Sequence, residues 1–232
     1  MELTIFHYHL LPGGVTSVIA NALKAFREGP GEVEKIRVVH GKGGDPEALV
    51  KAATDFTINI IFEENSLIGY SSSTDRGSLG SLKTRLLTQY GGSTWWVHNY
   101  HLGKNPLFTS ALTEIALKHP EQRMVFHIHD FPESGRWDNL MLLYSCLGKG
   151  LYPQGPNIRY AVINLRDYGY LLEAGVPKER VFYLPNALPS PGPSAGLTGK
   201  RGKEIKRLLS NPFPCLAEGP WALYPVRAIR RK

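Results

Sequence analysis

The feature that most constrains the fold of this chain is an alternation of short β-favouring runs with longer segments of helical spacing. The runs are apolar at nearly every position, as expected for strands that are covered on both faces of a sheet. They lie at residues 3–8, 35–40, 56–62, 94–100, 123–129, 159–164 and 180–185. Helices are predicted between them at residues 15–26, 46–53, 81–89, 106–119, 137–147 and 166–175. The alternation predicts an α/β, Rossmann-like fold, in which a parallel sheet carries helices on both faces.

The character of the chain changes after residue 188. Residues 1–188 contain all of the alternating elements, so we expect them to form one domain. Residues 189–220 are rich in proline and glycine and predict a linker, within which 200–210 has the composition of a basic helix. Residues 221–232 begin with an apolar run that is typical of a strand. We expect this strand to open a second domain that is truncated.

Length and composition predict a folded, soluble protein. The 232 residues are 42% hydrophobic, which is enough to bury a substantial core. No apolar stretch reaches the roughly 18 residues of a membrane span, and the N-terminus lacks the basic start of a signal peptide. The two cysteines, Cys146 and Cys215, form neither a disulfide framework nor a CxxC metal motif. We therefore expect a cytoplasmic protein with reduced cysteines.

The positive charge of the chain favours anionic partners. Its formal net charge is +7, from 27 Lys and Arg against 20 Asp and Glu. Charge alone leaves nucleic acid, anionic lipid and phosphorylated ligands open. The basic segment 200–210 is amphipathic, which predicts peripheral contact with an anionic membrane. The alternative is a surface helix that packs its apolar residues against the domain.

A diglycine bend, Pro12-Gly13-Gly14, lies between the first predicted strand and the first predicted helix. Ligands of open parallel sheets bind beyond the carboxyl ends of the strands, where a strand leads into a helix N-terminus. Glycines allow close approach of a ligand and positive φ, and the helix start offers free N–H groups to an anion. Thr16 and Ser17 add hydroxyl donors. The alternative is a tight turn that only starts the helix.

Histidines are concentrated at the ends of predicted strands. Six of the eight histidines lie there: His7, His9, His98, His101, His127 and His129. The carboxyl ends of parallel strands share one edge, so we expect these side chains to line one cleft. We favour a cleft for sugar and phosphate, because neutral imidazole both donates and accepts hydrogen bonds. The alternatives are a zinc site with Asp130 or Glu133 as a further ligand, and a hydrogen-bonded loop cluster without a ligand.

Three stretches together resemble family-4 glycosyltransferases of the GT-B fold. The sequence PGGV at 12–15 resembles the GG loop that follows their first strand, and 159–188 resembles the end of their N-terminal domain. Residues 223–232 are similar to the first strand of their C-terminal domain. The three stretches occur in the family's order and span nearly the whole chain. The resemblance implies the N-terminal half of a GT-B fold, followed by a donor-binding domain that has only begun.

The resemblance implies retaining transfer of a hexose from a nucleotide-diphosphate sugar to a hydroxyl acceptor, which is a sugar, a lipid-linked sugar or a small molecule. It implies no metal or other cofactor for catalysis and no nucleic-acid partner. Two Glu eight residues apart, which the family carries in its second domain, occur nowhere in this chain. We therefore expect this chain to be the incomplete N-terminal part, inactive alone. The alternative is a non-catalytic Rossmann-like module that binds a nucleotide or a phosphorylated sugar.

The resemblance also implies roles for individual residues. The segment 127–134, HIHDFPES, resembles the family's HD segment, which makes His129 and Asp130 the expected catalytic residues, with His127 as the alternative to His129. The expected substrate-binding residues are His98, His101, His127 and Glu133.

The expected donor-binding residues come from both ends of the chain. Gly13 and Gly14 face the donor phosphates, and Arg227 and Lys232 correspond to the family's Arg and Lys that neutralise the departing diphosphate. The alternative for the second pair is a solvated basic tail.

Overall fold

The computed structural model describes residues 1–28, 32–46, 49, 58–147, 150–186, 203–204, 207–208 and 211. The chain divides into two compact units, Met1–Leu188 and Pro189–Lys232. In the second unit, Lys203, Glu204, Arg207 and Leu208 have helical backbone. The predicted strand at 221–226, with Arg227 and Lys232, lies outside the described residues, as does Cys215. No helix in the described part of the chain is both long and apolar enough to cross a membrane.

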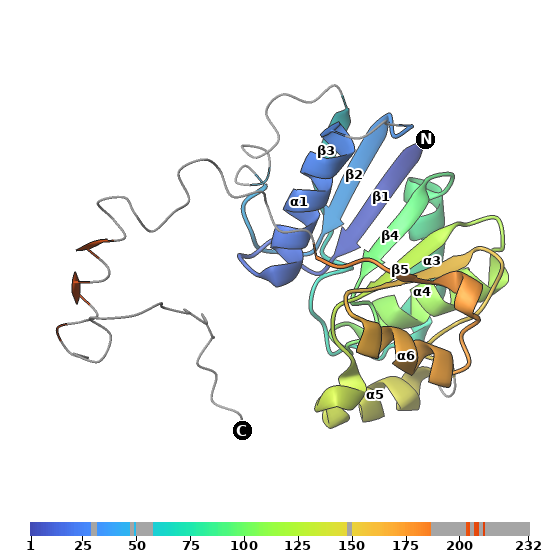
Figure 1. Ribbon diagram of the computed structural model, residues 1–232. Helices are drawn as coiled ribbons and strands as arrows, with labels where there is room; N and C mark the ends of the chain where they lie inside the picture. Colours follow the sequence, from blue (N-terminus) through green and yellow to red (C-terminus); the bar gives the residue numbers. More distant parts are fainter. Residues whose placement is uncertain are drawn as a thin grey trace. The chain divides into compact units, whose positions relative to one another are not determined.

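The first unit contains a seven-stranded, fully parallel sheet, which confirms the predicted α/β, Rossmann-like fold (Figure 1). The strand order is β3-β2-β1-β4-β5-β6-β7. The strands are β1 (Glu2–His7), β2 (Lys35–His40), β3 (Asn59–Glu64), β4 (Thr94–His98), β5 (Met124–Ile128), β6 (Ile158–Val162) and β7 (Val181–Tyr183). The helices are α1 (Gly14–Glu28), α3 (Leu79–Tyr90), α4 (Pro106–Lys118), α5 (Trp137–Leu147) and α6 (Leu165–Glu173). Short 3₁₀ turns occur at Arg76–Ser78, Pro132–Ser134 and Lys178–Arg180.

Helices cover both faces of the sheet because successive strand residues point to opposite faces. Ile5 of β1 packs in one core cluster with Ile19 and Leu23 of α1. Phe6, the next residue of β1, packs in the other cluster with Leu112 of α4. The predicted helix at 46–53 lies mostly outside the described residues.

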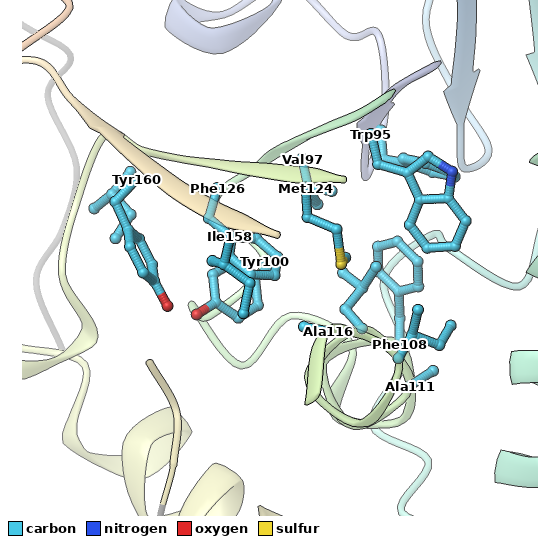
Figure 2. Packing of buried hydrophobic residues seen from close by; sticks show 14 of the residues in the cluster. Trp95, Val97, Tyr100, Phe108, Ala111, Ala116, Met124, Phe126, Ile158 and Tyr160 are labelled. Carbon is cyan, nitrogen blue, oxygen red and sulfur yellow. The ribbon is translucent and has the colours of Figure 1, made fainter. Parts of the chain in front are cut away.

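Large aromatic residues fill the core on the α4 face, as Figure 2 shows. The rings of Tyr100 and Phe126 stack 4.1 Å apart between centroids. Buried hydroxyls are satisfied by backbone carbonyls: Tyr100 donates to Leu151 at 2.5 Å, and Tyr160 donates to Pro153 at 2.7 Å. The core thus anchors the loops that follow β4 and precede β6.

A turn at Asn99 ends β4 two residues before the predicted end. Asn99 is the only non-glycine residue with positive φ, 53°, in the described part of the chain. Its N–H donates to the carbonyl of His127 at 2.9 Å, and its Oδ1 accepts from the N–H of His129 at 2.8 Å. These two bonds fix the ends of β4 and β5 relative to each other.

The diglycine bend adopts an ordinary backbone. Neither Gly13 nor Gly14 has a positive φ, so the bend does not use the positive φ that glycine allows. The hydroxyls of Thr16 and Ser17 donate to the carbonyls of Leu11 and Gly13, at 2.7 Å and 3.0 Å. They therefore brace the bend through its backbone. A Cβ added at Gly14 would meet nothing within 4 Å, which means that this glycine borders open space.

Candidate functional site

Histidine side chains meet at the carboxyl edge of the sheet, at β1, β4 and β5. His7 ends β1, His98 ends β4, and the two strands pair side by side. His127 pairs with His98 across β4 and β5, and His129 follows two residues later on the same face. The chain crosses from one side of β1 to the other between β3 and β4, so this edge is the topological switch point where ligands of such sheets bind.

Five imidazoles form a continuous row, called here the histidine row: His7, His9, His98, His127 and His129. Successive ring centroids lie 5.1 Å apart for His7 and His9, 6.2 Å for His7 and His98, and 5.2 Å for His98 and His129. The rings of His127 and His129 are 4.1 Å apart. A hydrogen bond of 3.0 Å joins His98 Nδ1 to His129 Nε2. The structure therefore brings together three of the predicted site histidines, His98, His127 and His129.

Burial keeps the histidine row uncharged. It lowers the pKa of His7 and of His127 to about 3 and that of His129 to about 4, because a buried imidazolium loses its hydration. The pKa of His98 lies well below its usual value for the same reason, and the neighbouring imidazoles lower it further. At neutral pH the row therefore offers neutral rings with free lone pairs.

A pocket of about 240 Å³, called here the diglycine pocket, opens beside one end of the histidine row. It is lined by His7, Tyr8, His9, Gly13, Gly14, Val15, Thr16, Tyr70, Asn99, Leu102, Lys104 and Arg136. The N-terminus of α1 and two cationic side chains, Lys104 and Arg136, meet there. This combination favours an anionic group such as phosphate.

Lys104 and Arg136 were missed by the sequence analysis. Each lies in a loop, where no periodicity predicts which way a side chain points. Lys104 Nζ lies 5.3 Å from the ring centroid of Tyr70, and the Tyr70 hydroxyl lies 3.0 Å from His9 Nε2. Only their positions in the sequence could have indicated them. Lys104 closely follows the end of a predicted strand, and Arg136 lies six residues after Asp130.

Asp130 holds Arg136 in place. Its Oδ2 accepts from Arg136 Nε at 3.2 Å and also contacts the Arg136 Nη2 group. Its Oδ1 accepts from the N–H of Phe131 at 3.1 Å. Both carboxylate oxygens are therefore engaged, and Asp130 influences the diglycine pocket through the guanidinium.

His101 and Glu133 lie apart from the diglycine pocket. His101 is fully buried, and its ring lies 5.8 Å from Phe131 and 5.6 Å from Tyr152 between centroids. Glu133 accepts hydrogen bonds of 3.0 Å at both oxygens from the Tyr152 hydroxyl. Glu133 lines a separate aromatic pocket of about 360 Å³, together with Phe131, Ser134, Tyr152, Tyr170 and Ala174.

An apolar pocket of about 330 Å³ adjoins the other end of the histidine row. It is lined by Val18, Asn21, Ala22, Ala25, Phe26, Trp96, His127, Leu184 and Pro185. The ring of His127 stacks on Trp96 at 5.7 Å with an interplanar angle of 11°. The row thus extends from a cationic pocket to an apolar one.

Comparison with known proteins places this site in a biochemical context. The whole chain aligns with mannosylglucosyl-3-phosphoglycerate synthase of Petrotoga mobilis, with 36% identity over 244 residues. The alignment covers 46% of that protein, so the chain spans about half the length of the curated relative that it matches. No protein-family model matches the chain. No solved structure matches it either.

Proposed function

We propose that this chain is part of a glycosyltransferase. The observation that carries the proposal is the 36% identity, along the entire chain, to a synthase whose name specifies a mannosylglucosyl phosphoglycerate product. Forming such a product joins sugars, which requires a sugar donor and an acceptor. The finer proposal is retaining transfer of a hexose from a nucleotide-diphosphate sugar to a hydroxyl acceptor, without a metal in the catalytic step.

The diglycine pocket supports the donor side of this proposal. A departing nucleoside diphosphate gains negative charge, and preformed cations and N–H groups lower the energy of that charge. Lys104, Arg136 and the N-terminal amides at Gly13 and Gly14 supply such groups around one pocket. Arg227 and Lys232, the other two expected donor-binding residues, lie outside the described residues, and their role stays a prediction.

The histidine row supports a role in binding the sugar. A neutral His129 can accept a hydrogen bond from a sugar hydroxyl beside the reacting carbon, and His98, bonded to it, fixes its ring. We assign His129 as the catalytic residue, and Asp130 acts with it by positioning Arg136. His127 and His98 complete the sugar side of the proposed site. Glu133 would contact the acceptor through the aromatic pocket, whereas His101 is fully buried and does not line that pocket.

The proposal extends to the organisation of the protein. Residues 1–188 form the acceptor-side domain of a family-4-like GT-B enzyme, 189–220 form the linker, and 221–232 begin the donor-binding domain. Transfer by residues 1–232 alone is then expected to be low or absent. A cytoplasmic location, with peripheral membrane contact through 200–210, belongs to the same proposal.

Release of nucleotide from UDP-, GDP- and ADP-sugars by the intact gene product tests the function. A matched pair of variants tests whether the donor binds in the diglycine pocket. Lys104→Ala changes the pocket, and Lys118→Ala changes an exposed lysine at the end of α4. Loss of one charge-assisted contact should raise the donor KM about 10- to 100-fold for Lys104→Ala. Lys118→Ala should match the wild type.

Two results would contradict the proposal. Ligand binding without turnover by the intact protein would favour the alternative, a non-catalytic module for a nucleotide or a phosphorylated sugar. A Lys104→Ala effect on the acceptor KM alone would reject the donor assignment of the diglycine pocket while leaving the transferase assignment intact.

A further inference from the structure

Three histidines of the row lie close enough to share one metal ion. His98, His127 and His129 each offer a ring nitrogen, and these atoms all lie within 4.8 Å of one another. Nitrogens bound tetrahedrally to zinc, at about 2.0–2.1 Å, lie roughly 3.4 Å apart. One such separation, from His98 Nδ1 to His129 Nε2, is 3.0 Å. Small rotations of the rings would therefore create a three-nitrogen site.

Unpaired buried nitrogens are the second observation that points to a ligand. Among the described residues, neither ring nitrogen of His127 has a hydrogen-bond partner, and His98 Nε2 has none. Both side chains are 1% exposed, so water does not reach them freely. Burying a polar atom without a partner costs about 1–3 kcal/mol, and native proteins rarely leave such atoms unpaired. Coordination to a cation would give His127 a partner for one of its nitrogens.

The backbone holds the three rings together independently of any ligand. His98 and His127 are opposite each other in the β4–β5 register, and Asn99 bonds to the backbone of both His127 and His129. Such a fixed arrangement limits the entropy that ordering the ligands would otherwise cost. Three imidazoles would fill three of the four positions of a tetrahedral zinc site, and in catalytic zinc sites the fourth position holds water or substrate.

The carboxylates that the sequence suggested as zinc ligands are engaged elsewhere. Asp130 pairs with Arg136, and Glu133 accepts both of its bonds from Tyr152. The site therefore consists of imidazoles alone. Imidazole favours zinc, cobalt, nickel and copper over magnesium and calcium, which take oxygen ligands.

We propose that His98, His127 and His129 bind a divalent transition metal of the zinc class, with one position left for water or a substrate oxygen. The proposal does not rest on glycosyl transfer, because the ligand set alone defines it. A bound ion would occupy the lone pair of His129, so metal binding and the metal-free role proposed for His129 in transfer are alternatives for this residue.

Metal uptake by tag-free protein tests the proposal. The protein is stripped with a chelator, dialysed, titrated with Zn²⁺, Co²⁺ or Mg²⁺, and examined by elemental analysis, thermal unfolding and the visible spectrum of the cobalt form. We expect one equivalent of zinc or cobalt, a raised melting temperature, and cobalt bands typical of low-coordinate nitrogen ligation. Magnesium should produce no shift.

Matched variants assign the ligands. His129→Gln changes a half-buried ligand, and His119→Gln changes a half-buried histidine outside the row, whose imidazole pairs with Glu121. Substitution of residues that only hydrogen-bond to metal ligands typically weakens metal binding about 10- to 100-fold. Loss of a ligand itself, as in His129→Gln, should therefore weaken it by at least about 100-fold. His119→Gln should leave affinity unchanged. His127→Gln tests a second ligand and should weaken metal binding as well. If that variant does not fold, a change in the visible spectrum of the cobalt-loaded His129→Gln protein shows whether a ligand has been lost.

The proposal would be overturned by wild-type protein that takes up no zinc or cobalt after stripping. Equal affinity of His129→Gln and the wild type would overturn it as well, since the metal would then bind elsewhere. Neither result would touch the proposed transferase function, which is measured by nucleotide release.

Discussion

Two glycine-containing loops at the carboxyl edge of the sheet differ in why they need glycine. In the loop after β2, a Cβ at Gly44 would lie 2.2 Å from the backbone carbon of Leu10, and Gly44 has a φ of +113°. Gly41 is equally confined, because its Cβ would lie 2.2 Å from Gly69 Cα. In the diglycine bend after β1, Gly14 has neither a positive φ nor a neighbour within 4 Å of a Cβ.

The difference distinguishes glycines that the packing of the backbone requires from a glycine that it does not require. Gly41 and Gly44 allow the loop after β2 to pack against the segment that leads into the diglycine bend, where Leu10 N–H donates to the Gly43 carbonyl at 2.9 Å. Gly14 meets no such requirement, and it borders the diglycine pocket. We therefore propose that its small size leaves room for a ligand.

The largest expected effect is that of Gly44→Ala. The added methyl group would collide with the backbone of Leu10 and force a φ that L residues rarely adopt. We expect the free energy of unfolding to fall by about 3 kcal/mol or more, measured by urea denaturation. Gly14→Ala is the matched control. Equal stability of the two variants would show that the contrast between the loops is false.

His101 lies in the core, away from the diglycine pocket, and its burial makes the stability of the fold depend on pH. Burial lowers the pKa of His101 to about 3, while nearby Asp130 raises it and His129 and Arg136 lower it by smaller amounts. The unfolded chain takes up this proton near pH 6.5, but the folded protein does not, so stability is lost as the pH falls from 6.5 towards 3. The slope is about 1.4 kcal/mol per pH unit.

Comparing wild type with His101→Gln isolates this contribution. Between pH 7 and pH 5, the free energy of unfolding of the wild type should fall by about 2 kcal/mol more than that of the variant. Urea denaturation at the two pH values measures it. Parallel losses in both proteins would mean that the folded protein protonates His101 as readily as the unfolded chain does, and so that its imidazole is hydrated rather than buried.

The smallest effect expected is that of Gly14→Ala, and it should appear in binding alone. Alanine at a helix start removes freedom from the unfolded chain, so stability should stay unchanged or rise by up to about 1 kcal/mol. The methyl group enters the diglycine pocket, and binding of a nucleotide-diphosphate sugar should weaken about ten-fold, or about 1.4 kcal/mol. Calorimetric titration measures the affinity. Unchanged affinity would place the ligand elsewhere.

The sequence predicted the sheet well because its strands are covered on both faces and therefore appear as apolar runs. It placed the end of β4 too late, since the apolar and aromatic residues continue past Asn99 while the backbone turns there. The strand predicted at 56–62 corresponds to β3 at Asn59–Glu64, which ends two residues later than predicted. Local composition favours a strand but does not set the register, which depends on pairing with β2.

The site was predicted in part. His98, His127 and His129 meet because strand ends share an edge, which the topology dictates. The sequence analysis expected both His101 and His98 to bind substrate. The chain turns at Asn99, however, and His101 lies in the core beside Phe131 and Tyr152. Lys104 and Arg136 lie in loops, and only tertiary contacts bring them to the diglycine pocket.

The most direct test is a crystal structure of the protein with a bound nucleotide-diphosphate sugar. We expect its phosphates beside the N-terminal amides of α1, within hydrogen-bonding reach of Lys104 or Arg136, and its sugar directed towards His129. A diphosphate bound in the aromatic pocket, or anywhere away from the diglycine bend, would contradict the proposed site.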